Sequence, residues 1–220
     1  MLYTICLLGA WLIWHLFYRF RVVGRKNLPR GGYVMVCNHV AATDIVYLVL
    51  ARFAWPKAII LAKQELFHIT PILTWYIRRM GAVPVSRGRG DSTVIEQTVE
   101  KARAGRDVLI FPEGTRSKTG ELGPLKSGAF LIAAKANVPV VPCRVLYQDG
   151  RPRFWRRVTL AIGQPLTPQQ LGLSGEWEHM PPASALRGAK ARCAQEMERL
   201  RRENAARTRC EKAEASKAPD

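Results

Sequence analysis

Short apolar runs alternate along this chain with longer segments in which apolar residues recur at helical spacing. Runs of this length that are rich in Val, Ile, Leu and Ala are typical of strands covered on both faces. The alternation of the two patterns predicts an α/β fold with a mixed, largely buried sheet flanked by helices. The predicted strands cover residues 33–37, 58–62, 82–85, 108–111, 139–145 and 158–162, and the predicted helices cover residues 44–53, 72–80, 92–104 and 127–136.

The N-terminal segment, residues 1–17, is apolar apart from one threonine and one histidine. A helix of this length extends about 26 Å, slightly less than a hydrocarbon core of about 30 Å. We therefore expect an N-terminal hydrophobic membrane-anchoring helix. It either spans a thinned bilayer or lies in the interface with Trp11, Trp14 and Tyr18 at headgroup depth. A buried core helix is the alternative.

Basic residues follow the apolar segment, namely Arg19, Arg21, Arg25 and Lys26. Positive charge beside an anchor favours the cytoplasmic face of a membrane, which would be the inner membrane in a bacterium. The segment lacks the basic start and the small-residue cleavage site of a signal peptide. These features predict three parts: an anchor at residues 1–24, a catalytic domain at residues 25–182, and a basic C-terminal helix and tail at residues 183–220.

An imidazole and a carboxylate, His39 and Asp44, lie five positions apart just after the strand predicted at 33–37. Five helical residues rotate by about 140°, so the two side chains meet only if His39 stays in a loop and Asp44 begins the next helix. Thr43 suits the N-cap of such a helix. Asp44 would then hold the ring in one tautomer while its other nitrogen takes a proton from a hydroxyl. A chance pairing among four histidines is the alternative.

A polar loop follows the strand predicted at 108–111 and contains Glu113, Gly114, Thr115 and Arg116. A backbone N–H freed by glycine, a hydroxyl and a guanidinium together suit a phosphate monoester. We expect Glu113 to orient Arg116 or to hydrogen-bond a substrate hydroxyl. An exposed turn without a ligand is the alternative.

Two more segments, residues 81–88 and 138–142, complete a pattern of four blocks. In this order and spacing the blocks resemble the glycerophospholipid acyltransferase superfamily, of the 1-acylglycerol-3-phosphate (lysophosphatidate) acyltransferase type, over roughly residues 25–165. The resemblance implies the glycerolipid acyltransferase fold and a catalytic pair formed by His39 and Asp44. It further implies that the acceptor is bound by Arg87, Glu113, Gly114, Thr115, Arg116 and Lys126, and that Pro142 shapes the acyl or acyl-donor pocket.

The resemblance implies transfer of a fatty acyl group from acyl-CoA or acyl-ACP to the free hydroxyl of lysophosphatidate, which gives phosphatidate for phospholipid biosynthesis. Neither a metal nor a cofactor is expected, because the thioester is a co-substrate. Ala41 and Ala42 depart from the serine and bulky residue that many members carry. Another acceptor, such as a lyso-ornithine lipid, therefore remains an alternative, as does a non-catalytic lysolipid-binding membrane protein.

The net charge of +17 and the pI near 10.3 indicate an anionic partner. Nucleic acid is not expected, because no nucleic-acid-binding motif occurs and the basic residues are spread along the chain. An anionic membrane surface, coenzyme A or an acidic carrier protein fits better. Residues 151–157 combine basic and aromatic side chains and predict a membrane or donor contact, with a solvated hairpin as the alternative. The five cysteines lack metal-ligand spacing and indicate free thiols, with Cys37 as a packing residue.

Overall fold

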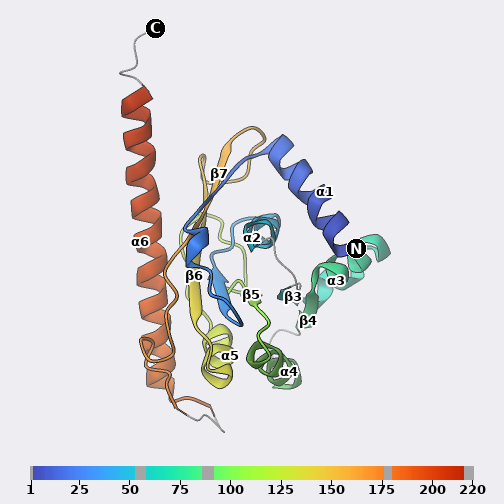
Figure 1. Cartoon of the computed structure of the whole chain (residues 1–220), viewed down its shortest axis with the longest axis vertical. Helices are drawn as coiled ribbons and strands as arrows, with labels where there is room; N and C mark the ends of the chain where they lie inside the picture. Colours follow the sequence, from blue (N-terminus) through green and yellow to red (C-terminus); the bar gives the residue numbers. More distant parts are fainter. Residues whose placement is uncertain (1, 53–57, 86–91, 176–179, 216–220) are drawn as a thin grey trace.

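The fold is built on one seven-stranded sheet with helices on both faces (Figure 1). The computed structural model describes residues 2–52, 58–85, 92–175 and 180–215. The strand order is β1-β7-β6-β2-β5-β3-β4, with β6 and β7 antiparallel and the other neighbouring pairs parallel. The strands are β1 (Arg19–Val23), β2 (Val34–Cys37), β3 (Ile59–Lys63), β4 (Ala82–Val85), β5 (Val108–Ile110), β6 (Val140–Tyr147) and β7 (Arg157–Ile162). The predicted mixed sheet flanked by helices is confirmed.

Alternating residues of the central strand β2 contact helices on opposite sides of the sheet. Val34 and Val36 pack in one core cluster with α4, α5 and α6, while Met35 and Cys37 pack in a second cluster with α1, α2 and the end of α3 (Figure 1). Both faces of β2 are therefore buried, as its continuous apolar sequence predicts. The helices are α1 (Leu2–Phe17), α2 (Asp44–Arg52), α3 (Pro71–Met80), α4 (Ser92–Arg103), α5 (Gly128–Ala136) and α6 (Ala183–Ala215), with short 3-10 helices η1 (Arg25–Asn27) and η2 (Gln64–His68).

The predicted strands and helices all occur, with ends within three residues of the expected positions. The sequence did not reveal β1, whose arginines suggested charge beside an anchor rather than a strand. Only β7 pairs with β1 among the described strands, so the arginines at positions 19 and 21 can point away from the core at this sheet edge. The sheet thus begins before residue 25, the predicted start of the catalytic domain.

The N-terminal helix α1 packs one face into the core cluster that also contains α2 and exposes much of the remainder. Tyr3, Leu7 and Ala10 are buried, whereas Ile5 and Leu12 are exposed. Across residues 2–52, 58–85, 92–175 and 180–215, no helix has both the length and the apolar character needed to cross a membrane. The spanning form of the predicted anchor is therefore not borne out, and the core-helix alternative holds for one face of α1.

We predict that Gly24→Ala lowers the free energy of unfolding by about 2 kcal/mol or more. Gly24 follows β1 with φ +79°, and an added Cβ would lie 2.1 Å from the Ile162 carbonyl oxygen, which already accepts a hydrogen bond from Asn27. Denaturant unfolding measures the change. Gly188→Ala in α6 is the matched control, because nothing lies within 4 Å and helix propensity should raise stability by about 0.5 to 1 kcal/mol. Equal effects of the two substitutions would contradict this account.

Candidate active site

The loop between β2 and α2 brings the imidazole of His39 against the carboxylate of Asp44. The distance between His39 Nδ1 and Asp44 Oδ2 is 2.9 Å. Asp44 is the first residue of α2 and is fully buried, while the His39 side chain is 20% exposed. The prediction that His39 stays in the loop and Asp44 begins the helix is confirmed. With Asp44 ionised, Nδ1 donates the hydrogen bond, so Nε2 is the ring nitrogen that can accept a proton.

The same carboxylate organises the rest of the loop. Asp44 Oδ2 accepts hydrogen bonds from the backbone N–H groups of Val40, at 2.6 Å, and Ala41, at 2.8 Å. Its other oxygen, Oδ1, accepts a hydrogen bond from the Tyr147 hydroxyl. Burial raises the pKa of Tyr147, and the negative charge of Asp44 raises it further. Tyr147 therefore stays protonated and acts as a donor.

Tyr147 is a site residue that the sequence analysis missed. It lies 103 positions from Asp44, at the end of β6. One sequence signal was available, namely the position of Tyr147 just after the strand predicted at residues 139–145. In the structure β6 is parallel to β2, so the carboxyl ends of both strands meet at the edge of the sheet where ligands bind in open α/β folds.

The ring of His39 stacks on Phe111, which follows β5 directly. The ring centroids are 4.2 Å apart and the planes differ by 16°. Because β5 pairs with the other side of β2, the two sheet neighbours of β2 each contribute one contact to the pair, Phe111 to the ring and Tyr147 to the carboxylate.

Glu113 connects the two loops that the sequence analysis singled out. One carboxylate oxygen accepts the backbone N–H of His39 and the other accepts that of Gly123, both at 2.9 Å. Ser117 N donates in turn to the His39 carbonyl oxygen at 2.7 Å. Glu113 is only 7% exposed. Both oxygens therefore bind backbone N–H groups, and neither is bonded to the Arg116 side chain, which is one of the two partners that we expected from the sequence.

Lys126 lies over the glycine of the predicted phosphate loop. Gly114 has φ +72°, and a Cβ added there would lie 2.7 Å from Lys126 Nζ. The backbone N–H of Lys126 bonds the Pro112 carbonyl oxygen at 2.9 Å. Thr115 and Arg116 follow Gly114 directly in the sequence, and both are exposed. The structure thus brings Lys126 to the loop of residues 113–116, with cationic side chains available to an anion.

One other predicted residue, Pro142, does not join this group. Arg87 lies outside the described residues. Pro142 is buried in β6, opposite Val36 of β2 and against Gly163, where an added Cβ would approach its Cγ to 3.1 Å. Pro142 packs within the sheet and is not among the residues lining the groove beside the site.

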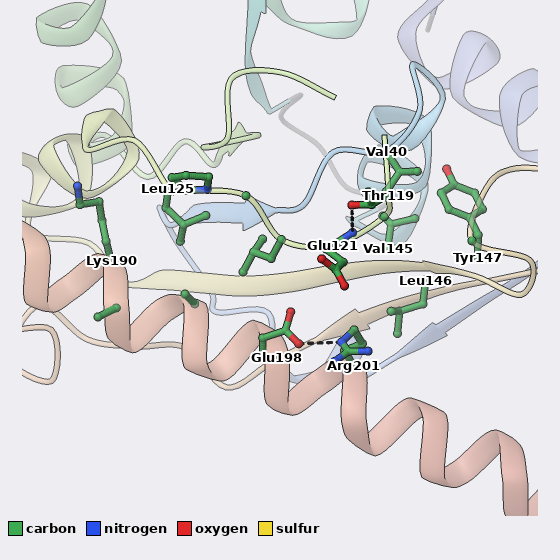
Figure 2. Close-up of a pocket in the computed structure, with 17 residues that line it drawn as sticks. Val40, Thr119, Glu121, Leu125, Val145, Leu146, Tyr147, Lys190, Glu198 and Arg201 are labelled. Carbon is green, nitrogen blue, oxygen red and sulfur yellow. Dashed lines mark hydrogen bonds and ion pairs between the residues drawn. The ribbon is translucent and has the colours of Figure 1, made fainter. Parts of the chain in front are cut away.

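A groove of about 1010 Å³ begins beside the loop between β2 and α2 and runs along α6 (Figure 2). Val40 and Tyr147 line it, and both donate a hydrogen bond to Asp44. The loop of residues 119–125 and one face of α6 form its sides. The apolar lining residues include Leu122, Leu125, Val145, Leu146, Ala191 and Ala194. The sequence indicated only a basic C-terminal helix here, and the structure shows that α6 builds one side of the groove.

A buried guanidinium fixes α6 against β6 beneath this groove. Arg144 is fully buried, and its Nη2 lies 3.2 Å from Oε1 of Glu198, whose other oxygen is 2.7 Å from Arg201. Burial lowers the pKa of Arg144, and the charge of Glu198 opposes that shift. The pair links the side of the groove to the sheet that carries the loop of His39 and Asp44.

Cys37 is a packing residue, as the sequence analysis expected. It is fully buried at the end of β2, and burial raises the pKa of its thiol well above the ordinary range, with the charge of Asp44 adding to the effect. A thiol that stays protonated is a poor nucleophile. Within the part of the chain that the structure describes, no group of three or more His, Cys, Asp or Glu residues could hold a metal ion.

Comparison with known proteins gives one family and several relatives. A family model described as Acyltransferase matches residues 19–146. The chain is 41% identical over 134 residues to a chloroplastic 1-acyl-sn-glycerol-3-phosphate acyltransferase of Brassica napus, covering 59% of this chain and 38% of the relative. It is 35% identical over 136 residues to a lyso-ornithine lipid O-acyltransferase of Pseudomonas aeruginosa, covering 60% and 50%. The chain spans half or less of the length of these two curated relatives.

A solved structure shows the same architecture. The 1-acyl-sn-glycerophosphate (LPA) acyltransferase PlsC from Thermotoga maritima superposes with a TM-score of 0.65 at 25% sequence identity. The similarity covers 90% of this chain and 79% of that one. It therefore includes elements outside residues 19–146, the range matched by the family model.

We predict that Glu113→Gln lowers the free energy of unfolding by about 1 to 3 kcal/mol. The amide keeps one acceptor oxygen, so the backbone N–H of either His39 or Gly123 loses its partner in a buried place. Thermal or denaturant unfolding measures the loss. Glu121→Gln, an exposed carboxylate of the neighbouring loop, is the control and should change stability by less than about 0.5 kcal/mol. A wild-type stability for Glu113→Gln would show that the two hydrogen bonds do not hold the loops together.

Proposed function

The chain belongs to the acyltransferase family, and from this premise we propose that it transfers a fatty acyl group from a thioester to the free hydroxyl of lysophosphatidate. The product would be phosphatidate, a precursor in phospholipid biosynthesis. The observation that carries the proposal is the imidazole of His39, whose Nδ1 is held by a buried carboxylate 2.9 Å away while its Nε2 can accept a proton. This arrangement suits a general base acting on a hydroxyl.

The reaction we propose needs no covalent acyl-enzyme. Nε2 of His39 takes the proton of the acceptor hydroxyl as the oxygen attacks the thioester carbonyl carbon. The tetrahedral intermediate then expels the thiolate by breaking its carbon–sulfur bond, and the imidazolium returns the proton to the sulfur. Asp44 favours this cycle because its negative charge stabilises the imidazolium, and general-base help of this kind contributes about 10² to 10⁴-fold.

The acceptor phosphate would bind at the loop of residues 113–116. The exposed hydroxyl of Thr115, the guanidinium of Arg116 and the ammonium of Lys126 above Gly114 are suitable donors. Arg87 is proposed as a fourth donor on the strength of the family pattern alone. We assign Glu113 a positioning role, because both of its oxygens already accept backbone N–H groups. The guanidinium and ammonium would hold the acceptor in register with His39.

The groove along α6 would hold an acyl chain. Its side chains are mainly small or aliphatic, and its end at Val40 and Tyr147 adjoins the catalytic pair, where the reacting carbonyl must lie. Apolar surface buried in this way contributes about 25 cal/mol per Å². The donor is proposed as acyl-CoA or acyl-ACP, without a metal or other cofactor, and Pro142 as a residue that supports the pocket from within the sheet.

The site is proposed to work at an anionic membrane surface on its cytoplasmic face. Support comes from the net charge of +17 and from α1, whose outer side exposes large apolar residues such as Leu8, Leu12 and Leu16. A helix that is apolar on its exposed side lies readily in the bilayer interface. This retains the interfacial form of the predicted anchor.

We predict that membranes carrying the protein convert lysophosphatidate and long-chain acyl-CoA into phosphatidate, and that His39→Ala lowers the rate by about 10² to 10⁴-fold. Thiol release and phosphatidate formation are measured together, and the melting temperature verifies the fold. His68→Ala, an exposed histidine of η2, is the control and should keep the wild-type rate.

Three outcomes would separate the alternatives. Turnover only of phosphate-free acceptors, such as lyso-ornithine lipid, would show that the acceptor is not lysophosphatidate. It would agree with the name of the Pseudomonas aeruginosa relative. Binding of lysolipid without turnover, unchanged in His39→Ala, would indicate a non-catalytic lipid-binding protein. Turnover by His39→Ala at the wild-type rate would remove His39 from the mechanism.

A second prediction addresses the groove. Ala194→Phe places a ring among the groove-lining residues. Activity with long acyl chains should then fall by about tenfold relative to short chains, which is the effect expected if the ring displaces two methylene groups of the acyl chain from the groove. Competition between acyl-CoA chain lengths measures the preference. Ala205→Phe, at an exposed position further along α6, is the control. The same preference in both variants would place the acyl chain elsewhere.

A further inference from the structure

Three elements far apart in the sequence expose large apolar side chains. The outer side of α1 carries several of them, including Leu12 and Phe17, and η2 with α3 adds Ile72, which is 81% exposed. The turn of residues 148–156 between β6 and β7 adds Phe154 and Trp155. We call these three elements together the apolar platform. Exposed apolar residues are common singly, but a group on neighbouring elements marks a binding surface.

The turn is held against the end of α1 by specific contacts. The backbone N–H of Trp155 donates to the Phe17 carbonyl oxygen at 2.8 Å. The ring of Phe17 lies 5.5 Å from that of Phe154 and 6.1 Å from that of Trp155, and Tyr18 lies 5.7 Å from Phe154. The turn and α1 therefore present their aromatic side chains as one continuous patch.

Trp155 holds an unfavourable backbone conformation while leaving its side chain in solvent. Its φ is +63°, in the left-handed region that non-glycine residues seldom adopt, and the side chain is 60% exposed. Such a conformation costs of order 1 to 3 kcal/mol, and burial of the indole within the protein offsets little of that. A bilayer would supply the missing burial, because tryptophan favours the headgroup region.

Helix α3 continues the surface on the other side of α1. Cys6 of α1 and Tyr76 of α3 pack against the same core cluster, and α3 lies beside the N-terminal half of α1 (Figure 1). Trp75 and Ile72 are exposed on α3. The apolar platform thus runs from α3 along α1 to the turn. The sequence predicted α1 as a membrane element and residues 151–157 as a membrane or donor contact, but it did not indicate a membrane contact for α3.

Basic residues border this surface and favour a lipid partner. The turn contains the exposed Arg151, Arg153 and Arg156, with one acid, Asp149, 3.4 Å from Arg156. α3 ends with two exposed arginines, at positions 78 and 79. Aromatic and aliphatic residues bordered by arginines match the depth profile of an anionic bilayer, in which apolar groups enter the interface and arginines meet the phosphates.

We propose that the turn of residues 148–156 and helix α3 are two further membrane contacts, which together with α1 dock the apolar platform on an anionic bilayer. Three contacts fix the orientation of the protein, whereas one helix leaves it free to roll. The turn continues directly from Tyr147, which hydrogen-bonds Asp44. If the proposed function holds, docking through the turn also keeps the catalytic pair close to the surface from which the lysolipid arrives.

The test is co-sedimentation of the full chain with vesicles of phosphatidylcholine containing phosphatidylglycerol. Trp155→Asn removes the indole but suits a positive φ, so the melting temperature should not fall while vesicle partitioning weakens by about tenfold. Ile72→Asn should weaken partitioning similarly. Met180→Asn is the matched control, because Met180 is 68% exposed and precedes α6 in the sequence. The N-terminal end of α6 lies far from the turn between β6 and β7 (Figure 1). Pure phosphatidylcholine should bind the wild type more weakly than the mixed vesicles.

Several results would overturn the proposal. If Trp155→Asn and Ile72→Asn partition like Met180→Asn, α1 alone contacts the membrane. If the wild type forms a dimer that either substitution dissociates, with unchanged vesicle binding, the platform is a contact between copies of the chain. Because the assay needs no turnover, failure of docking and failure of the proposed acyl transfer can be told apart.

Discussion

The buried carboxylate of Asp44 is the interaction on which the site depends. It accepts hydrogen bonds from the His39 ring, from two backbone N–H groups of its own loop, and from the Tyr147 hydroxyl. A buried ionised carboxylate is costly unless it is fully hydrogen-bonded, so the loop that follows β2 can close only around these donors. The group that orients the imidazole therefore also determines the shape of the loop and its attachment to β6. In this way the stability of the loop and the geometry of the candidate base have the same physical origin.

The second carboxylate, Glu113, extends the same principle between loops. Through the backbone of His39 and Gly123 it ties the ends of β2 and β5 to the loop that borders the groove. Parallel strands bring these ends to one edge of the sheet, and the buried pairing of β2 with β5 and β6 makes that edge rigid. Small residues, exposed cations and a groove lined partly by aliphatic side chains then converge where the strands end. Such an arrangement suits a reaction that must align two amphiphilic substrates, because much of the acceleration comes from positioning.

The helices α1 and α6 lie at the outside of the fold, and each has a side that the rest of the protein does not cover. α1 buries Tyr3, Leu7 and Ala10 in the core and exposes most of its other large side chains. It thus belongs both to the packed domain and to the apolar platform. α6 shows the reverse pattern, with a groove-lining and core-packing side near the domain and a charged surface toward its C-terminal end. The hydrophobic effect places the buried faces of both helices, while the partner of the uncovered side of α1 is the lipid surface we propose.

The sequence by itself determined the alternation of strands and helices, the loop position of His39 and the helical position of Asp44. Each of these follows from local patterns: apolar run length, helical periodicity and the rotation of five residues around a helix. Only the tertiary structure decided that β1 joins the sheet, that Tyr147 reaches Asp44 over 103 positions, and that Glu113 bonds backbone instead of Arg116. It also decided that α6 forms one side of the groove and that Trp155 takes a positive φ beside Phe17. These features depend on contacts between segments that are distant in the sequence, and a local residue pattern does not predict which distant segments the fold brings together.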